Sequence, residues 1–502
     1  MLANLKKLKE NKEYTLAPVS MEILSDFITP IEAMRILKAA STHAYLLESA
    51  KANENWGRYT FLGFEPELSI SCIDGKMNVD GKEFECSDPT NYLRELLKKY
   101  KSPRISSLPP FTGGLVGYFS FDFINYKEPS TKMNIDDSEG FKDIDLMLFK
   151  DVIAFDNVKQ KIILITNIEL DKDIRVEYEK ALQRLNSIKE LLYTGKKSFE
   201  GGKLLGEVTP LFSKDEFSDM IGKAKHHIHE GDIFQIVLSN RLQANFEGSL
   251  FDTYRVLRTV NPSPYMFHFP TKYGDVVGSS PEILAEILFN NIYIAPIAGT
   301  RPRGKDANED AFLAQDLLND PKECAEHRML VDLARNDIGK FARQGSVIVK
   351  NMMHVKHYQH VMHIVSEVFG QKRNDVSLFD IISSVFPAGT LSGAPKIRAM
   401  EIIGELEEYK RNIYGGGIGF LHFNGNMQLA IVIRSAFFAN RNNATDNISG
   451  KNTSEGNNVS KVFIQAGAGI VYDSIKEKEY EEITHKRASV LNIFKNNCKE
   501  RG

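Results

Sequence analysis

The sequence predicts an α+β fold, with many antiparallel strands and with helices packed on the outside. Short apolar or alternating runs recur along the whole chain and are separated by turn residues, as expected of strands. Near the carboxyl end, an Asn-Gly pair stands between two β-rich runs in IGFLHFNGNMQLAIVIRSAFFA, which strongly indicates a hairpin. Other stretches carry apolar residues at helical spacing. The two kinds of segment together favour a mixed fold.

Composition narrows the class of protein. The chain has 502 residues, of which 42% are hydrophobic and 26% charged, and this is enough for a large core in several domains or in one large β-rich unit. The net charge of −3 gives no general attraction to nucleic acid or anionic membranes, so we expect neither as a partner. Because no secretory signal and no apolar run of ~20 residues occurs, we expect a cytoplasmic protein.

The four cysteines are scattered along the chain at Cys72, Cys86, Cys324 and Cys498. No pair has zinc-finger or redox spacing, so free thiols are expected. None stands in the glycine-flanked turn of a thiol nucleophile, and an amidotransferase site is therefore not expected in this chain. The glycine-rich loops of dinucleotide and nucleoside triphosphate sites are also missing from the sequence.

Residues 1–195 mix predicted strands with one long helix. FTGGLVGYFSFDF (111–123) is typical of a buried strand, and DLMLFKDVIAFD and KIILITNIEL are typical of paired strands. RVEYEKALQRLNSIKELLY follows with helical spacing. The polar, glycine-containing stretch TGKKSFEGG (194–202) then predicts a linker before the second part, 203–495.

The second part opens with a predicted helix, since Ser213 and Glu216 have the spacing of a capping box. Gly231 is expected to end this helix, and IFQIVLSNRLQA to form the strand that follows. Further strands are predicted at VVGSSPEILAEIL and NIYIAPIAGT. Residues 440–460 are rich in Asn, Ser, Gly and Thr, so we expect a disordered and dispensable hairpin tip there.

Two groups of carboxylates suggest a metal site. In the predicted helix after Pro321, the apolar stripe extends backwards to Glu326 and Glu323, and buried carboxylates are costly unless they are paired or bind a metal. In KEKEYEEITHKRASVL, Glu479, Glu482 and Lys486 share one helix face. One carboxylate from each helix would suit Mg²⁺. Ordinary pairing on solvated helix faces is the alternative for both groups.

Four histidines in HVKHYQHVMH resemble a metal box, but their spacing of three residues argues against one. On a helix this spacing drifts around the axis, and on a strand successive members change face. At most one or two of them can share a site, and most are expected to be single histidines with local partners.

Three stretches are typical of backbone that binds an anion: GTRPRG, PAGTLSGAPK and QAGAGIVYD. Their glycines allow amides to approach a carboxylate closely. Arg434 stands in the apolar run AIVIRSAFF, where a cation needs an anionic partner, either a ligand or a carboxylate of a neighbouring strand. Jointly these features predict a pocket for a small dicarboxylate, with Mg²⁺ at one end and arginine and lysine at the other.

Motifs spread over nearly the whole chain carry a family resemblance. They are LLESA (46–50), GDIFQIVLSNR (231–241), PSPYMF (262–267), GSSPE (278–282), PIAGTRPRG (296–304), EHRMLVDLARND (326–337), HVMH (360–363), FPAGTLSGAPKIRAME (386–401), YGGGIG (414–419), IVIRSA (431–436) and QAGAGIV (465–471). In these the chain resembles the chorismate-utilising enzymes, and most closely the large subunits (component I) of anthranilate synthases. The resemblance implies a large antiparallel β-sandwich core in which the sheets of both parts are interleaved.

The resemblance also implies the roles of individual residues in a lyase reaction. Glu326 and Glu482 would bind Mg²⁺, which holds the ring carboxylate of chorismate. Glu282 would be the general acid that helps the ring hydroxyl leave, Thr390 and Lys486 would be further catalytic residues, and His363 would lie beside the ring. The remaining substrate-binding residues would be Gly299, Thr300, Tyr414, Arg434, Gly467, Ala468 and Gly469.

Regulation and a partner follow from the same resemblance. Leu47, Glu48 and Ser49 would form a tryptophan site for feedback inhibition together with Pro264, Tyr265 and Met266. The alternative for LLES is a buried strand with one polar end. A glutamine amidotransferase subunit (component II) would supply ammonia, so a hetero-oligomer is expected.

Two residues distinguish between members of the family. Where para-specific relatives typically carry a nucleophilic lysine, this chain has Ala298, and where water-using relatives carry a lysine that activates water, it has Gln235. This combination favours direct attack of ammonia at C2 and hence anthranilate. Aminodeoxychorismate synthase is the alternative enzyme, with the isochorismate and salicylate synthases after it, and an inactive tryptophan-sensing homologue is the non-enzyme alternative.

Overall fold

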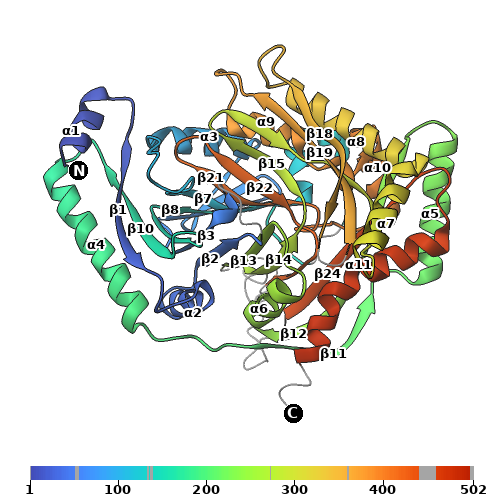
Figure 1. Ribbon diagram of the computed structural model, residues 1–502, viewed down its shortest axis with the longest axis horizontal. Helices are drawn as coiled ribbons and strands as arrows, with labels where there is room; N and C mark the ends of the chain where they lie inside the picture. The colour runs from blue at the N-terminus through green and yellow to red at the C-terminus, as the bar shows by residue number, and fades with distance from the viewer. Residues whose placement is uncertain are drawn as a thin grey trace.

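The computed structural model describes residues 2–50, 56–132, 135, 139–271, 273–358, 361–439 and 460–497. Within these residues the strands form two twelve-stranded sheets, and every strand pairing is antiparallel. Helices lie around the sheets, with α1 (Leu2–Asn11) and α4 (Ile174–Thr194) together at one end of the molecule and α5 (Lys214–His229) and α11 (Lys476–Asn497) at the other (Figure 1). The predicted α+β fold with an antiparallel core is confirmed.

The first sheet has the order β1-β10-β9-β3-β2-β13-β14-β23-β24-β12-β11, with β20 beside β12. Its strands are β1 (Leu16–Leu24), β2 (Ala44–Glu48), β3 (Tyr59–Phe64), β9 (Asp151–Asp156), β10 (Lys161–Glu169), β11 (Gly202–Pro210), β12 (Gln235–Gly248), β13 (Tyr265–Thr271), β14 (Gly274–Ser280), β20 (Gly393–Ala394), β23 (Ser435–Ala439) and β24 (Ser460–Ile470).

The second sheet has the order β17-β19-β16-β15-β22-β21-β7-β8-β4-β5-β6, with β18 beside β19. Its strands are β4 (Leu68–Ile73), β5 (Lys76–Val79), β6 (Lys82–Glu85), β7 (Gly114–Phe119), β8 (Ile144–Phe149), β15 (Ile283–Leu288), β16 (Asn291–Ile294), β17 (Ile297–Pro302), β18 (Ile348–His357), β19 (Val361–Gln371), β21 (Gly417–His422) and β22 (Met427–Ile431).

Both sheets take strands from both sides of the stretch 194–202. In the first sheet, β2 pairs with β13, so that Glu48 lies opposite Met266. In the second sheet, β7 pairs with β21. The segment between α4 and β11, without helix or strand over 195–201, therefore joins two parts that share their sheets, as Figure 1 shows along the lower edge of the molecule.

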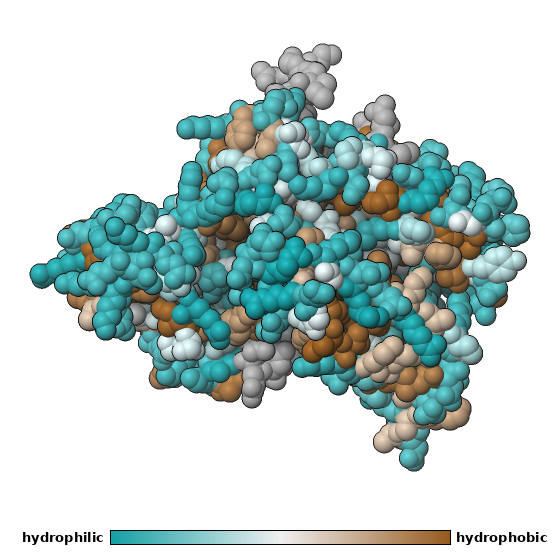
Figure 2. Space-filling view, turned by 90° about the horizontal axis from the view of Figure 1, so that it is seen from above, coloured by the Kyte–Doolittle hydropathy of each residue, from teal (hydrophilic) through white to brown (hydrophobic). Residues whose placement is uncertain are grey.

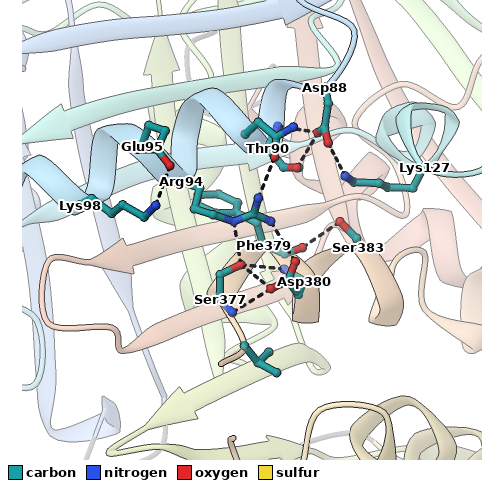
Figure 3. A network of polar contacts seen from close by, with 12 residues as sticks. Asp88, Thr90, Arg94, Glu95, Lys98, Lys127, Ser377, Phe379, Asp380 and Ser383 are labelled. Atoms are coloured by element: carbon teal, nitrogen blue, oxygen red, sulfur yellow. Dashed lines mark hydrogen bonds and ion pairs between the residues drawn. The ribbon is translucent and has the colours of Figure 1, made fainter. Parts of the chain in front are cut away.

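A polar cluster between two helices joins the same two parts. Arg94 of α3 (Pro89–Lys99) donates to Asp380 at 2.9 Å and to Ser377 at 3.2 Å (Figure 3). Ser377 and Asp380 form the capping box at the start of α9 (Leu378–Val385). The guanidinium thus places a positive charge beside the carboxylate and hydroxyl groups that cap α9, a helix of the second part of the chain.

The core lies chiefly between the sheets and is rich in aromatic side chains. Phe111, Phe119, Phe123 and Phe149 are fully buried there, and the rings of Phe111 and Phe420 lie 4.3 Å apart. On the outer side of the first sheet, α2 (Pro30–Ala40), α4 and α6 (Phe251–Val260) cover a second apolar layer. Large aromatic rings carry much of the burial energy of such layers.

Several predicted elements are confirmed, and others differ in detail. The capping box of Ser213 and Glu216 starts α5, and the Asn-Gly pair turns β21 into β22 with Gly425 at φ +87°. The strand predicted over 111–123 ends at Phe119, and 121–126 form a 3₁₀-helix because Asn412 accepts from Phe121 and leads the chain out of the sheet. At Lys150 the chain crosses from one sheet to the other, so β8 does not pair with β10.

Two predicted strands are each split. VVGSSPEILAEIL forms two strands in different sheets, β14 and β15, with Pro281 and Glu282 between them, and NIYIAPIAGT forms β16 and β17, which both pair with β19. The predicted loop 440–460 lies outside the described residues except for Ser460, the first residue of β24. No helix in the described part of the chain is long and apolar enough to cross a membrane.

Seen from above, hydrophilic side chains cover most of the surface and hydrophobic ones form separate patches (Figure 2). Such scattered apolar side chains are normal on a surface that faces water.

Candidate active site

Glu282 lies where the chain passes from β14 to β15, and only 8% of its surface is exposed. The hydroxyl of Thr390, in the 3₁₀ turn Gly389–Leu391, donates to Glu282 Oε1 at 2.9 Å. Burial raises the pKa of Glu282 to about 7, against smaller lowering effects of Thr390 and the charge of Lys486. Because Oε1 accepts from Thr390, Oε2 is left available to carry the proton. The pair can therefore act as an acid near neutral pH.

Lys486 connects its own helix, α11, to β24, the strand that carries Gly467 and Gly469. Its Nζ donates to the carbonyl of Gly467 at 2.9 Å and lies 2.6 Å from Glu482 Oε1. Gly467 needs its small size, because a Cβ there would lie 3.0 Å from the carbonyl oxygen of Leu238 and 3.1 Å from the hydroxyl of Tyr414. The sequence-predicted Gly467, Tyr414 and Lys486 thus come together.

Arg434 brings a second cation to the same region. It follows β22 in the left-handed conformation, at φ +51°, and its Nη1 donates to the carbonyl of Lys486 at 3.3 Å. Burial lowers the pKa of Arg434, and the interactions with Tyr414 and Glu482 oppose this lowering. A guanidinium remains charged even so, and it makes this end of the site suited to a carboxylate.

Glu326 on α8 (Pro321–Gly339) accepts from Gln235 Nε2 at 2.9 Å. Burial raises the pKa of Glu326, and the charge of Glu482 on α11 raises it further, while the bond from Gln235 lowers it. A Cβ on Gly469 would lie 2.8 Å from Gln235 Nε2, so β24 packs closely against the Gln235 side chain. The carbonyl oxygen of Gln235 is buried and has no hydrogen-bond partner within the described part of the chain.

Two further carboxylates adjoin this group. Burial raises the pKa of Glu323, with the charge of Glu326 adding to it, and a Cβ on Gly299 would lie 3.0 Å from Glu323 Oε2. Burial and the charge of Glu482 also raise the pKa of Glu479. Among the described residues no three Asp, Glu, His or Cys side chains form a metal-holding group by themselves. The donors fit an ion such as Mg²⁺, which takes few protein carboxylates and completes its shell with water or ligand oxygens.

His363 lies on β19, next to the strand that carries Gly299 and Thr300. Its Nδ1 is 2.7 Å from the carbonyl of Gly299 and 3.1 Å from the hydroxyl of Thr300. Since a carbonyl can only accept, Nδ1 carries the proton and Nε2 keeps its lone pair. Burial lowers the pKa of His363, and the charges of Arg434 and Lys486 support this. The imidazole is therefore neutral at pH 7.

The other histidines of the stretch do not join His363. His354 and His357 lie on β18, and His354 Nδ1 is 2.8 Å from the carbonyl of Asn351. His360 lies outside the described residues. Ala298, opposite Ile364 of β19, is buried and brings no functional group to the site.

The six residues of the predicted tryptophan site line one cavity of about 380 Å³. Leu47, Glu48 and Ser49 come from the end of β2, and Pro264, Tyr265 and Met266 come from the start of β13. This volume lies in the range of small-molecule sites, which is about 300–1,000 Å³.

Glu48 is tied to a helix at the edge of this cavity. Its carboxylate accepts from Arg258 at 2.5 Å and 3.0 Å and from Tyr254 at 2.5 Å, both on α6. The sequence did not single out Tyr59, Phe61, Glu286 or Lys356, which also line the cavity, because they belong to separate strands.

Glu407 and Arg411 form a buried ion pair that the sequence did not predict. The pair contacts β12, the strand next to β24. The sequence offered one signal for it. Arg411 precedes the apolar and glycine-rich run after residue 412, where a cation needs a partner.

Comparison with known proteins gives one consistent family. The sequence profile of the chorismate binding enzymes matches residues 42–492. Anthranilate synthase component 1 of Aquifex aeolicus is 42% identical over 98% of this chain and 96% of the relative. The protein of the same name from Acetivibrio thermocellus is 40% identical over 96% of this chain and 95% of its own length.

Solved structures agree with the sequence relatives. The structure of anthranilate synthase component I from Streptococcus pneumoniae is similar over 93% of this chain and 98% of that one, with a TM-score of 0.74 and 34% identity. The menaquinone-specific isochorismate synthase MenF of Escherichia coli shares the fold, with a TM-score of 0.67 and 17% identity. The chain therefore belongs to the family of chorismate binding enzymes, in the branch of anthranilate synthase component 1.

Proposed function

We propose that this chain converts chorismate and ammonia into anthranilate and pyruvate, the first step of tryptophan biosynthesis. The observation that carries the proposal is Glu282, a buried acid with a pKa of about 7, in contact with Thr390 and facing the cation Lys486. Such an acid can protonate a departing hydroxyl at neutral pH. The likeness to relatives named anthranilate synthase component 1 over nearly their full length supports the same reaction.

Substrate binding uses the two charged ends of the site. Arg434 and Tyr414 would hold the enolpyruvyl carboxylate, with the backbone of Gly467, Ala468 and Gly469 beneath it. At the other end, Glu326 and Glu482 would hold Mg²⁺, and their mutual repulsion in a partly buried place supports a cation there. When bound, Mg²⁺ would stabilise negative charge on the ring carboxylate.

Proton transfers follow from the hydrogen bonds of two residues. Glu282 Oε2 would donate its proton to the hydroxyl that leaves C4 as ammonia adds at C2. The neutral His363, with the lone pair on Nε2, would then accept the C2 proton as the C3 substituent leaves as the enolate of pyruvate, which takes up a proton to give pyruvate. Thr300 and Gly299 fix the ring of His363 for this step.

The choice of nucleophile rests on Ala298 and Gln235. A methyl group at residue 298 cannot attack C2, and a glutamine cannot deprotonate water, so neither a covalent route nor a water route has its catalyst. The buried, unpartnered carbonyl oxygen of Gln235 offers an acceptor for an N–H of ammonia. Ammonia is already a nucleophile and needs only to be held in place.

Ammonia would come from glutamine, supplied by a partner amidotransferase subunit (component II). Burial raises the pKa of Cys72 to about 11 and also raises that of Cys86, which makes both poor nucleophiles. Cys324 is buried and its Sγ donates to the carbonyl of Leu318. These properties of the described cysteines support a partner that brings the reactive thiol.

Tryptophan would inhibit the enzyme by binding in the 380 Å³ cavity between β2 and β13. The cavity combines aromatic walls from Tyr59, Phe61 and Phe369 with carboxylates from Glu286 and Glu367. An indole ring fits the first group and an ammonium the second.

The proposed reaction is tested with purified chain, chorismate, Mg²⁺ and ammonium. Fluorescent anthranilate should form, and its rate should depend on both Mg²⁺ and ammonium. The absence of a fluorescent product, or the appearance of para-aminobenzoate after addition of a lyase, would contradict the proposal.

A further inference from the structure

Glu407 and Arg411 form a buried ion pair that has no place in the reaction described above. Glu407 ends α10 (Lys396–Glu407), and Arg411 follows four residues later. The exposed fraction of their side chains is 0% and 1%. Arg411 Nη2 donates to Glu407 Oε1 at 2.6 Å, and Nε donates to Oε2 at 2.8 Å. Two charges so far from water are costly unless every donor and acceptor is used.

The remaining hydrogen bonds of the pair go to two other segments, and all but one of them involve backbone atoms. Arg411 donates through Nη1 to the carbonyl of Leu391 and through Nη2 to the carbonyl of Val237, both at 2.6 Å. Glu407 Oε1 accepts from the amide of Ser239 at 2.8 Å and from its hydroxyl at 3.0 Å. The pair thus joins β12 to the turn Gly389–Leu391.

Both of these segments carry parts of the chorismate site. Leu391 is the residue after Thr390, whose hydroxyl donates to Glu282. Val237 and Ser239 of β12 lie opposite Gly469 and Gly467 of β24. If the turn shifted against β12, Thr390 would move relative to β24, the strand that would lie under the substrate. Its contact with Glu282 would then change.

The geometry points to Glu407 and Arg411 as positioning residues that hold Thr390 at Glu282, and this inference rests on the proposed function. A planar guanidinium can direct two parallel bonds to a carboxylate while reaching two carbonyls in fixed directions. The turn is short and depends on such contacts, whereas β24 is held along the whole of β12 by its own ladder. Loss of the hydrogen bonds of the Arg411 guanidinium should therefore disturb the position of Thr390 more than that of β24.

The first test replaces Arg411 by lysine, which keeps the charge beside Glu407 but cannot reach Leu391 and Val237 together. We expect kcat to fall about 10- to 100-fold, the size of effect that misplaced catalytic groups produce, with KM for chorismate within about threefold of the wild type. The hydrogen bond from Thr390 lowers the pKa of Glu282. Its loss should therefore move the alkaline limb of the kcat profile to higher pH.

A matched control is Arg58→Lys, measured without tryptophan. Arg58 makes a bidentate contact with Asp156, through Nε at 2.8 Å and Nη2 at 2.5 Å, in the amino-terminal part of the first sheet. This variant should lose thermal stability while its kcat and its pH profile stay at wild-type values. If Arg411→Lys lost stability but also kept the wild-type kcat and pH limb, the positioning role would be wrong.

A milder variant covers the case in which Arg411→Lys does not fold. Ser239→Ala removes one bond to Glu407, together with the bond that Ser239 Oγ accepts from Gln465, which keeps its bond to Tyr409, and it leaves the ion pair intact. We expect its kcat to fall about threefold or more at unchanged KM, and an unchanged kcat in a folded protein overturns the inference. Wild-type protein in the same assay separates the two proposals. No anthranilate from the wild type contradicts both, whereas normal turnover by the wild type and the variants contradicts the positioning role alone.

Discussion

Glu282 shows how burial and one hydrogen bond adjust a carboxyl group to proton donation near neutrality. Burial accounts for most of the rise of its pKa from 4.5 to about 7, and Thr390 and Lys486 limit the rise. A fully exposed glutamate would be ionised at pH 7 and could donate no proton. The same residue therefore adds chemistry to the site and electrostatic cost to the fold.

Replacement of Glu282 by glutamine should abolish the proposed general acid while preserving the shape of the side chain. We expect kcat to fall at least 100-fold, because general acids typically contribute factors of about 10² to 10⁴. In the wild type, kcat should fall as the pH rises through about 7, where Glu282 loses its proton. Steady-state anthranilate formation between pH 5.5 and 9 measures both effects. A glutamine variant with wild-type kcat would show that another group supplies the proton.

The same variant should be more stable than the wild type at alkaline pH. The pKa of Glu282 is higher in the folded than in the unfolded protein. Relative to a variant that does not titrate, the wild type therefore has its full stability below pH 4.5 and loses part of it as the pH rises to about 7. The lost free energy of unfolding is roughly 3 kcal/mol. Glu282→Gln does not titrate, so its stability advantage should grow from pH 4.5 to 7 and then stay constant. Urea unfolding at pH 4.5 and pH 8 checks this sign.

Gln235 contributes a donor to Glu326 and an unpartnered carbonyl oxygen to the same site. We expect Gln235→Met, which keeps the length of the side chain, to raise KM for ammonium about fivefold, since one hydrogen bond is worth about 1 kcal/mol. KM for chorismate should change less, because Arg434 and Tyr414 are untouched and the carboxylate of Glu326 remains, although it loses its bond from Gln235. Titrations of ammonium at saturating chorismate give the first constant. An unchanged KM for ammonium would mean that Gln235 does not hold the nucleophile.

Among the elements, local signals identified segments well and their partners poorly. The capping box of Ser213 and the turn at Gly425 were predictable, because a few neighbouring residues determine them. The change of sheet at Lys150 was not, since β8 and β9 are both apolar and periodicity does not say which partner each strand pairs with.

The candidate site divides in the same way. The residue pattern placed the charges of Glu326 and Arg434 in apolar surroundings. Together with the glycine-rich stretches, these charges indicated a charged pocket without the family resemblance. The role expected of Glu282 came from the resemblance only, since its burial depends on strands of both sheets. The pair of Glu407 and Arg411 was missed because its partners lie on β12 and in the turn at Leu391, far away along the chain.

The meeting of β2 and β13 makes a prediction about regulation. Ser49→Phe would fill part of the 380 Å³ cavity with an aromatic ring, so we expect tryptophan to lose its inhibitory effect while kcat without tryptophan changes less than twofold. Inhibition curves and calorimetric titration with tryptophan measure the two properties. Val158→Phe, at an exposed position outside the cavity, is the control and should remain sensitive. Unchanged inhibition of Ser49→Phe would show that tryptophan binds elsewhere.

At the level of the whole molecule, the two parts of the chain form one structure with two shared sheets, and not two domains joined by a flexible linker. The strand pairs β2–β13 and β7–β21 and the bridge from Arg94 to Asp380 all cross the predicted boundary. The stretch 194–202 is itself anchored, because Arg35 of α2 contacts Ser198 and lies over the ring of Phe199. Sequence composition identified this stretch as a linker, but it could not reveal that the two parts share sheets.

This interleaving predicts the result of cutting the chain within 199–201. A protease site placed there should be cleaved, and the two fragments should stay together and keep kcat within about twofold of the uncut protein. The reason is that the ladders of both sheets cross the boundary, whereas the linker adds mainly the entropy of connection. The melting temperature should fall for the same reason. Gel filtration in buffer and in urea compares the cut protein with the uncut variant, and separation of active fragments in buffer would mean that the parts are independent domains.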